Sequence, residues 1–132
     1  MVLKRGQSAM EFIILIGFLL VAFVVFMLVI QENMEDRTDK RQNTQIIEIA
    51  LSVKNEVDLA YQSSDGYVRE FELEKNPYGG GYEVRIEDNL VFVNSVDWKH
   101  AISLAVPNVT GDVNKEGINI IKKENGQVIL NP

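Results

Sequence analysis

Three polarity patterns follow one another along the chain, and the first is an unbroken apolar run. Residues 12–30, nineteen in all, contain no ionisable side chain. At about 1.5 Å per residue, a helix of this run is about 28 Å long, close to the ~30 Å hydrocarbon layer of a bilayer. The run is longer than the apolar region of a secretory signal, which is about 7–15 residues, and no small-x-small cleavage site follows it. We therefore expect a transmembrane helix that is retained in the mature protein.

The second pattern is typical of an amphipathic helix. Residues 31–45 are polar and charged and contain neither Pro nor Gly. Apolar residues then return at spacings of three and four, which mark one face of a helix: Ile46, Ala50, Val53, Val57 and Ala60. We expect one helix over about residues 8–64, amphipathic in its second half. It should end at residues 63–66, where Gly66 suits the left-handed conformation.

The third pattern has a period of two and predicts β-strands. Apolar and polar residues alternate in segments separated by turn residues: 67–73, 82–86, 90–93, 98–106, 117–123 and 127–130. Asp88-Asn89 and Asn125-Gly126 predict two-residue hairpin turns, residues 76–81 a longer turn, and residues 107–114 a loop. The sequence therefore predicts an α+β fold, in which a long N-terminal helix is followed by a small antiparallel β-sheet. Residues 46–60 of the helix should cover the apolar face of that sheet.

The charge balance narrows the class of partner. The formal net charge is −6, and Lys and Arg form no cluster that could neutralise a phosphate backbone. We therefore expect no nucleic-acid partner. Lys4 and Arg5 precede the apolar run, and basic residues favour the cytoplasmic side of a membrane. The residues that follow the run should then lie outside the cell.

The composition also excludes most kinds of catalytic or metal site. The chain has no Cys, and His100 is its only His, which excludes disulfides, thiolate zinc sites, Cys nucleophiles and His-rich metal sites. Gly79-Gly80-Gly81 lacks the Lys and Ser/Thr of a phosphate-binding loop and is interpreted as a hairpin loop. We expect no enzymatic activity, no catalytic residue, no metal and no cofactor. Trp98 is interpreted as an anchor of the small core or as an interface residue.

A short motif lies between the basic residues and the apolar run. The residues Gly6-Gln7-Ser8-Ala9-Met10-Glu11-Phe12 resemble the class III signal of archaeal type IV pilins. In that family a basic leader ends in Gly, and the mature chain begins Gln-x-Ser-x-Glu-Phe. Gln7, Glu11 and Phe12 match this pattern, whereas Ala9 stands where the family has Ser. The resemblance implies that a prepilin peptidase cuts between Gly6 and Gln7 and removes the leader charges Lys4 and Arg5.

The resemblance also implies a role for Glu11. From its position alone, Glu11 would rest at the headgroup level, whereas a carboxylate deep in a bilayer costs roughly 2.5–3.5 kcal/mol and needs a partner. In type IV pilins the Glu at this position pairs with the free amine of a neighbouring subunit during assembly. Cleavage before Gln7 would create that amine. Glu11 and Phe12 are therefore expected to set the register of the assembled helices.

The resemblance implies a domain organisation and a set of partners. The leader would be residues 1–6, the transmembrane and assembly helix 7–30, an extended amphipathic helix 31–65 and an extracellular β-rich head 66–132. The precursor would reside in the cell membrane with its N-terminus cytoplasmic, and the mature subunit in a surface filament that serves adhesion. Besides the prepilin peptidase, the partners would be further copies of the chain in a helical homopolymer, an assembly ATPase and membrane platform proteins.

Asn108-Val109-Thr110 fits the N-glycosylation acceptor rule and lies in a predicted loop, so Asn108 is a candidate glycosylation site. A second function class fits the same topology. In that class the chain is a single-pass membrane-anchored extracellular binding protein, whose head recognises a ligand while the helix only anchors it.

Overall fold

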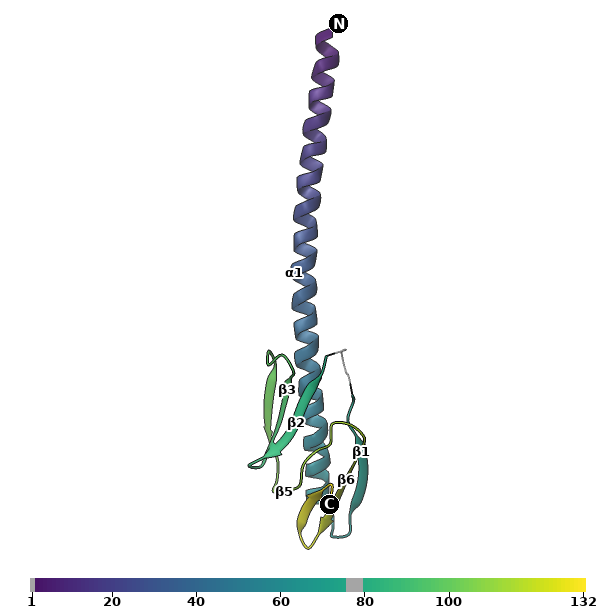
Figure 1. The fold of residues 1–132 in the computed structure, drawn as a ribbon, viewed down its shortest axis with the longest axis vertical. Coiled ribbons are helices and arrows are strands. Elements are labelled where there is room, and N and C mark those ends of the chain that lie inside the picture. Colours follow the sequence, from purple (N-terminus) through teal and green to yellow (C-terminus); the bar gives the residue numbers. More distant parts are fainter. Residues whose placement is uncertain (1, 76–79) are drawn as a thin grey trace. The chain divides into compact units, whose positions relative to one another are not determined.

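The computed structural model describes residues 2–75 and 80–132. A single long helix, α1 (Val2–Gln62), precedes seven strands, which confirms the predicted α+β fold with an N-terminal helix and a small β head. The strands are β1 (Val68–Glu72), β2 (Tyr82–Glu87), β3 (Leu90–Ser95), β4 (Ala101–Ala105), β5 (Val109–Thr110), β6 (Ile118–Glu124) and β7 (Gln127–Leu130) (Figure 1). The chain forms two compact units, one up to Asp39 and one from Lys40 onward.

Both ends of α1 differ slightly from the prediction. The helix begins at Val2, earlier than expected, because residues 2–5 contain no Pro and Gly6 costs a helix only about 1 kcal/mol relative to Ala. It ends at Gln62, where Ser63 N donates to the carbonyl oxygens of Leu59 (3.1 Å) and Ala60 (3.2 Å). Gly66 has the expected positive φ of 93°. It lies in the turn closed by Tyr67 N and Ser64 O (3.2 Å), after the helix rather than at its cap.

The strands form two sheets rather than one. One has the order β1-β6-β7-β5 and the other β2-β3-β4. All neighbouring pairs are antiparallel except β5 and β7, which are parallel. The prediction of a plain loop over residues 107–114 is therefore wrong at Val109–Thr110. A two-residue strand is too short to show alternation, and its pairing with Val128–Ile129 depends on tertiary contacts.

The predicted hairpin turns are confirmed where the structure describes them. Asp88 and Asn89 have φ of 50° and 61°, and Asn125 and Gly126 have φ of 53° and 77°. Both pairs thus have the two positive φ values that a type I′ turn requires. The predicted turn over residues 76–81 falls largely on residues 76–79, which lie outside the described residues.

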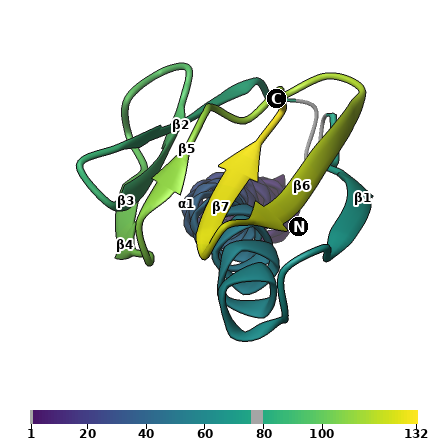
Figure 2. The same ribbon diagram turned by 90° about the horizontal axis from the view of Figure 1, so that it is seen from below.

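The core of the head lies between the second half of α1 and the sheets. The predicted helical face is fully buried at Ile46, Ala50, Val53, Val57 and Ala60. It packs with Tyr82, Val91, Val93, Ile121, Val128 and Leu130, which are also buried. Figures 1 and 2 show the strands gathered around the last turns of α1. Burial of each large side chain contributes about 1.5–3 kcal/mol, so this stripe holds the sheets against the helix.

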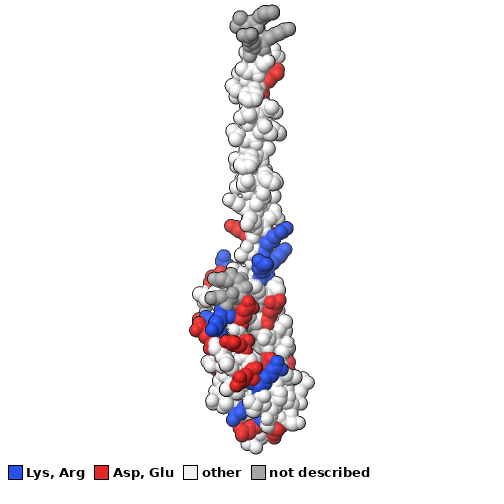
Figure 3. Space-filling model, turned by 90° about the vertical axis from the view of Figure 1, so that its right-hand side faces the viewer, with Lys and Arg blue, Asp and Glu red and all other residues white. Residues whose placement is uncertain are grey.

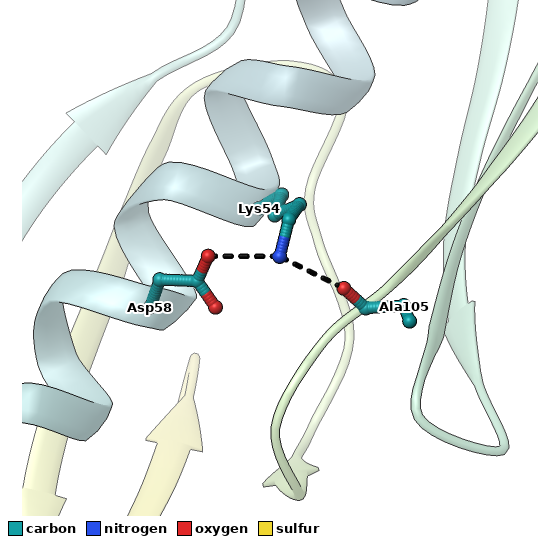
Figure 4. A network of polar contacts seen from close by, with 3 residues as sticks. All are labelled: Lys54, Asp58 and Ala105. Carbon is teal, nitrogen blue, oxygen red and sulfur yellow. Dashed lines mark hydrogen bonds and ion pairs between the residues drawn. The ribbon is translucent and has the colours of Figure 1, made fainter.

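Two lysine side chains link the strands to the helix through hydrogen bonds. Lys54 Nζ binds Asp58 Oδ2 at 2.8 Å and donates to Ala105 O at the end of β4 at 3.0 Å (Figure 4). Lys123 Nζ of β6 donates to Tyr61 O (2.5 Å) and Ser63 O (2.8 Å). These carbonyls belong to the last turn of α1 and the residues after it, where a helix has no donors of its own. Lys123 therefore caps α1 from the sheet.

Candidate membrane and assembly segment

The apolar run of α1 exposes its side chains on all sides. Every large apolar residue over 12–30 is exposed, from 36% at Ile30 to 71% at Phe18. In Figure 3 the segment is a stretch of surface without acidic or basic atoms. A helix that is apolar all round is found buried in a membrane or in the core of a protein assembly. The chain therefore has a helix that is long and apolar enough to cross a membrane.

The residues of the predicted processing and register site lie at one end of this segment. Gln7 Nε2 donates to Glu11 Oε1 at 3.4 Å, because residues four apart share one face of a helix. The side chains of Gln7, Glu11 and Phe12 are all exposed. No heavy atom lies within 4 Å of a Cβ built on Gly6. The structure thus brings Gln7 and Glu11 together on an open face of the helix. For Lys4 and Arg5 it describes the helical backbone but not the side chains.

Polar side chains bind back to the helix where the apolar run ends. Asn33 Nδ2 donates to Val29 O at 2.8 Å, and Thr38 Oγ1 donates to Met34 O at 2.9 Å. Glu32, Glu35 and Asp36 lie in the same stretch of sequence. The segment therefore changes over a few residues from a surface that avoids water to one that water can solvate.

The head places the other predicted residues at its surface. Asn108 is exposed between β4 and β5, and Thr110 of the same acceptor motif is exposed in β5. Trp98 is 67% exposed and has a positive φ of 59°. The interpretation of Trp98 as a core anchor is therefore wrong, because Tyr82 fills the equivalent large-aromatic role at 0% exposure. The interface interpretation of Trp98 stays open.

One feature of the head was not predicted from the sequence. A hollow of about 240 Å³ is lined by residues of three strands and of the turn between β3 and β4: Arg85, Phe92, Val93, Asn94, Trp98, Ala101, Ile102 and Ser103. Part of this hollow could have been predicted from the turn at Asp88-Asn89. A two-residue turn fixes the register in which Arg85 pairs with Phe92, so these two side chains could have been placed together.

Among the described residues of the head, Tyr82 and Asp97 have shifted pKa values. Burial, and secondarily the charge of Glu74, raises the pKa of Tyr82 to about 12, and the Tyr82 hydroxyl donates to Glu74 O at 2.8 Å. The hydrogen bond from Ser95, followed by that from the Lys99 amide, lowers the pKa of Asp97.

Over residues 2–75 and 80–132, no group of three or more His, Asp or Glu side chains could hold a metal ion. Known proteins add no further assignment, since no family model, curated protein or solved structure matches this chain.

Proposed function

We propose that this chain is the subunit of a type IV-like surface filament, assembled through its N-terminal helix. The observation that carries the proposal is the apolar surface of residues 12–30, exposed all around the helix. A membrane anchor needs only a lipid-compatible surface. This segment also bears Phe12, Phe18, Phe23 and Phe26, which could fill the space between packed helices, and Gly17, at which no atom lies within 4 Å of an added Cβ. Because Gly17 has no side chain, another helix can approach closely there.

Glu11 is proposed to pair with the ammonium of Gln7 on a neighbouring subunit. Hydrolysis of the Gly6–Gln7 peptide bond would produce this ammonium beside an acidic residue that already shares a helix face with Gln7. Either charge alone is costly inside an apolar helix bundle, whereas the pair offsets much of the cost and fixes the axial register. Removal of Lys4 and Arg5 would also change the formal charge from −6 to −8 and free the N-terminus from the cytoplasmic side.

The role proposed for the head is display and adhesion rather than catalysis. A chain without Cys and with a single His lacks the residues on which most nucleophilic and metal-assisted reactions depend. The proposed partners are a prepilin peptidase, further copies of the chain, an assembly ATPase and membrane platform proteins. Asn108, exposed outside the core, is proposed to carry a glycan.

The proposal is tested by mass spectrometry of the N-terminal peptide in sheared surface filaments and in membranes of the native host. A peptide that begins at Gln7 in the sheared fraction supports both cleavage and assembly. A protein that still begins at Met1 and is confined to membranes would overturn the proposal. That result would favour the single-pass anchored binding protein.

Substitution of Glu11 sharpens this test. Glu11→Gln keeps the shape of the side chain and removes its charge, so the ammonium of Gln7 is left unpaired in the bundle. Loss of one partner of a buried pair costs about 3–5 kcal/mol, and filaments should therefore fall below detection while the level in membranes is unchanged. Glu32→Gln, at the other end of the apolar run, is the matched control and should assemble normally. Normal filaments from Glu11→Gln would refute the proposed pairing.

A further inference from the structure

The hollow beside Trp98 lies on the face of the β2-β3-β4 sheet that points away from the core. Arg85 of β2 pairs with Phe92 of β3, and Phe92 pairs with Ser103 of β4, so these three side chains form one row across the sheet. Their neighbours along β3, Val91 and Val93, are buried on the opposite face. The row is therefore open to solvent, with Trp98 beside it in the lining of the hollow.

The turn that carries Trp98 is held firmly in an unfavourable conformation. A non-glycine residue with positive φ costs on the order of 1–2 kcal/mol, and Trp98 has φ 59°. Trp98 N donates to Ser95 O (3.0 Å), Ser95 Oγ donates to Asp97 Oδ1 (2.5 Å), and Lys99 N donates to the same carboxylate oxygen (3.2 Å). The backbone on both sides of Trp98 is thus fixed while the indole stays exposed, as expected of a preorganised contact.

The polar groups around the hollow have capacity for a ligand. The Arg85 guanidinium lies 5.5 Å from the centre of the Phe92 ring and, within the described part of the chain, makes no ion pair. The Trp98 indole N–H and the Ser103 hydroxyl also have no hydrogen-bond partner among the described residues. Asn94 Nδ2 already donates a hydrogen bond to Ser95 O (3.1 Å). A cation, an N–H donor and a hydroxyl therefore surround an aromatic surface.

Size and charge limit the class of ligand. About 240 Å³ is below the ~300–1,000 Å³ of pockets for drug-sized molecules, and it suits a single ring. A flat exposed indole packs against the C–H face of a sugar ring, and hydroxyl and N–H groups bind its hydroxyls. Arg85 favours a carboxylate, which it can bind through two parallel hydrogen bonds. Glu83 and Glu87 flank Arg85 on the same face of β2, so one carboxylate fits there and a polyanion is repelled.

We propose that this hollow binds one uronic-acid residue of a surface glycan, with its ring against Trp98 and its carboxylate on Arg85. The site would give the head a glycan specificity that is independent of how the chain assembles. Binding can therefore fail without affecting the filament proposal, and the filament proposal can fail without affecting this one.

The test uses the fact that Trp98 is the only Trp of the chain. The full chain is held in phosphocholine micelles, which contain no sugar headgroup, and titrated with a trisaccharide that contains a single glucuronic acid residue or with maltotriose, which is neutral. The expected result is a saturable change of Trp98 fluorescence with the acidic sugar. The midpoint concentration should be at least about tenfold lower than with maltotriose, because only the acidic sugar forms a charge-assisted pair with Arg85. No saturable change, or equal affinity for both sugars, would overturn the proposal.

Substitutions separate the proposed contacts from general effects on the head. Arg85→Gln should weaken binding of the acidic sugar at least about tenfold and remove the preference for it over maltotriose. Arg69→Gln, in the other sheet and paired with Glu56, is the matched control and should bind as the unchanged chain does. Unchanged binding by Arg85→Gln would contradict the assignment. A fluorescence change that follows protein concentration rather than sugar would assign the hollow to a second copy of the chain instead.

Discussion

Two regions of α1 carry similar side chains in opposite surroundings. Val24 in the apolar run is 56% exposed, whereas Val53 in the second half of the helix is 0% exposed. Over residues 46–60 the apolar side chains form a stripe, and this chain's own strands cover it. Over residues 12–30 they surround the helix, and nothing within the described part of the chain covers them. The comparison shows that the head completes its own core, while the apolar run depends on lipid or on other helices.

The largest expected effect comes from placing a carboxylate in each region. Val53→Asp should unfold the head. The cost of an unpaired buried charge exceeds the free energy of unfolding of a typical domain, which is about 5–15 kcal/mol. Val24→Asp should leave the unfolding of the head unchanged and reduce the fraction of chain in the membrane, at a cost of roughly 2.5–3.5 kcal/mol. Urea unfolding followed by Trp98 fluorescence and carbonate extraction of membranes measure the two effects. Unfolding of the head by Val24→Asp would show that the regions are not independent.

A smaller effect is expected from a pair of glycines. A Cβ at Gly111 would lie 1.9 Å from the backbone oxygen of Leu130, and its φ is 105°. Gly111→Ala should therefore destabilise the head by about 1–3 kcal/mol, measured as a lower urea midpoint. Gly17→Ala is the control, because a Cβ there meets no atom within 4 Å. Its urea midpoint should not move, and a shift as large as that of Gly111→Ala would contradict the comparison.

The smallest expected effect is a dependence of head stability on alkaline pH. The pKa of Tyr82 is raised from 10.0 to about 12, so the folded head holds the phenol proton more tightly than the unfolded chain does. The stability from this group is fully present below pH 10 and is lost as pH rises toward 12. The urea midpoint should fall over this range, and the fall should be smaller in Tyr82→Phe. An equal fall in both would assign the effect to other groups.

The sequence predicted the features that depend on local pattern. The stripe at Ile46, Val53 and Val57 and the turns at Asp88-Asn89 and Asn125-Gly126 follow from spacing and from the residues that tolerate positive φ. The helix of membrane-spanning length likewise follows from the uniform apolarity of residues 12–30. Cleavage before Gln7, the pairing of Glu11 and glycosylation of Asn108 stay predictions.

The features that were missed depend on contacts between distant residues. The strand at Val109–Thr110 exists only because β7 lies beside it. The exposure of Trp98 depends on the hydrogen bonds of its turn, so the sequence alone could not choose between a core anchor and an interface residue. The hollow requires the registers of two strand pairs at once. No local pattern in one strand contains that information.

The capping of α1 by Lys123 has a consequence for the order in which the head is completed during synthesis. The central strands of the four-stranded sheet, β6 and β7, follow all the other strands in the sequence. Until residues 118–130 emerge from the ribosome, β1 has no partner and the final carbonyls of α1 have no Lys123. The part of the buried core that Ile121, Val128 and Leu130 complete therefore stays open until these strands are made. Folding of the head is therefore completed only after β6 and β7 are synthesised, and a chain that stalls before β6 leaves this part of the core open to aggregation or to chaperones.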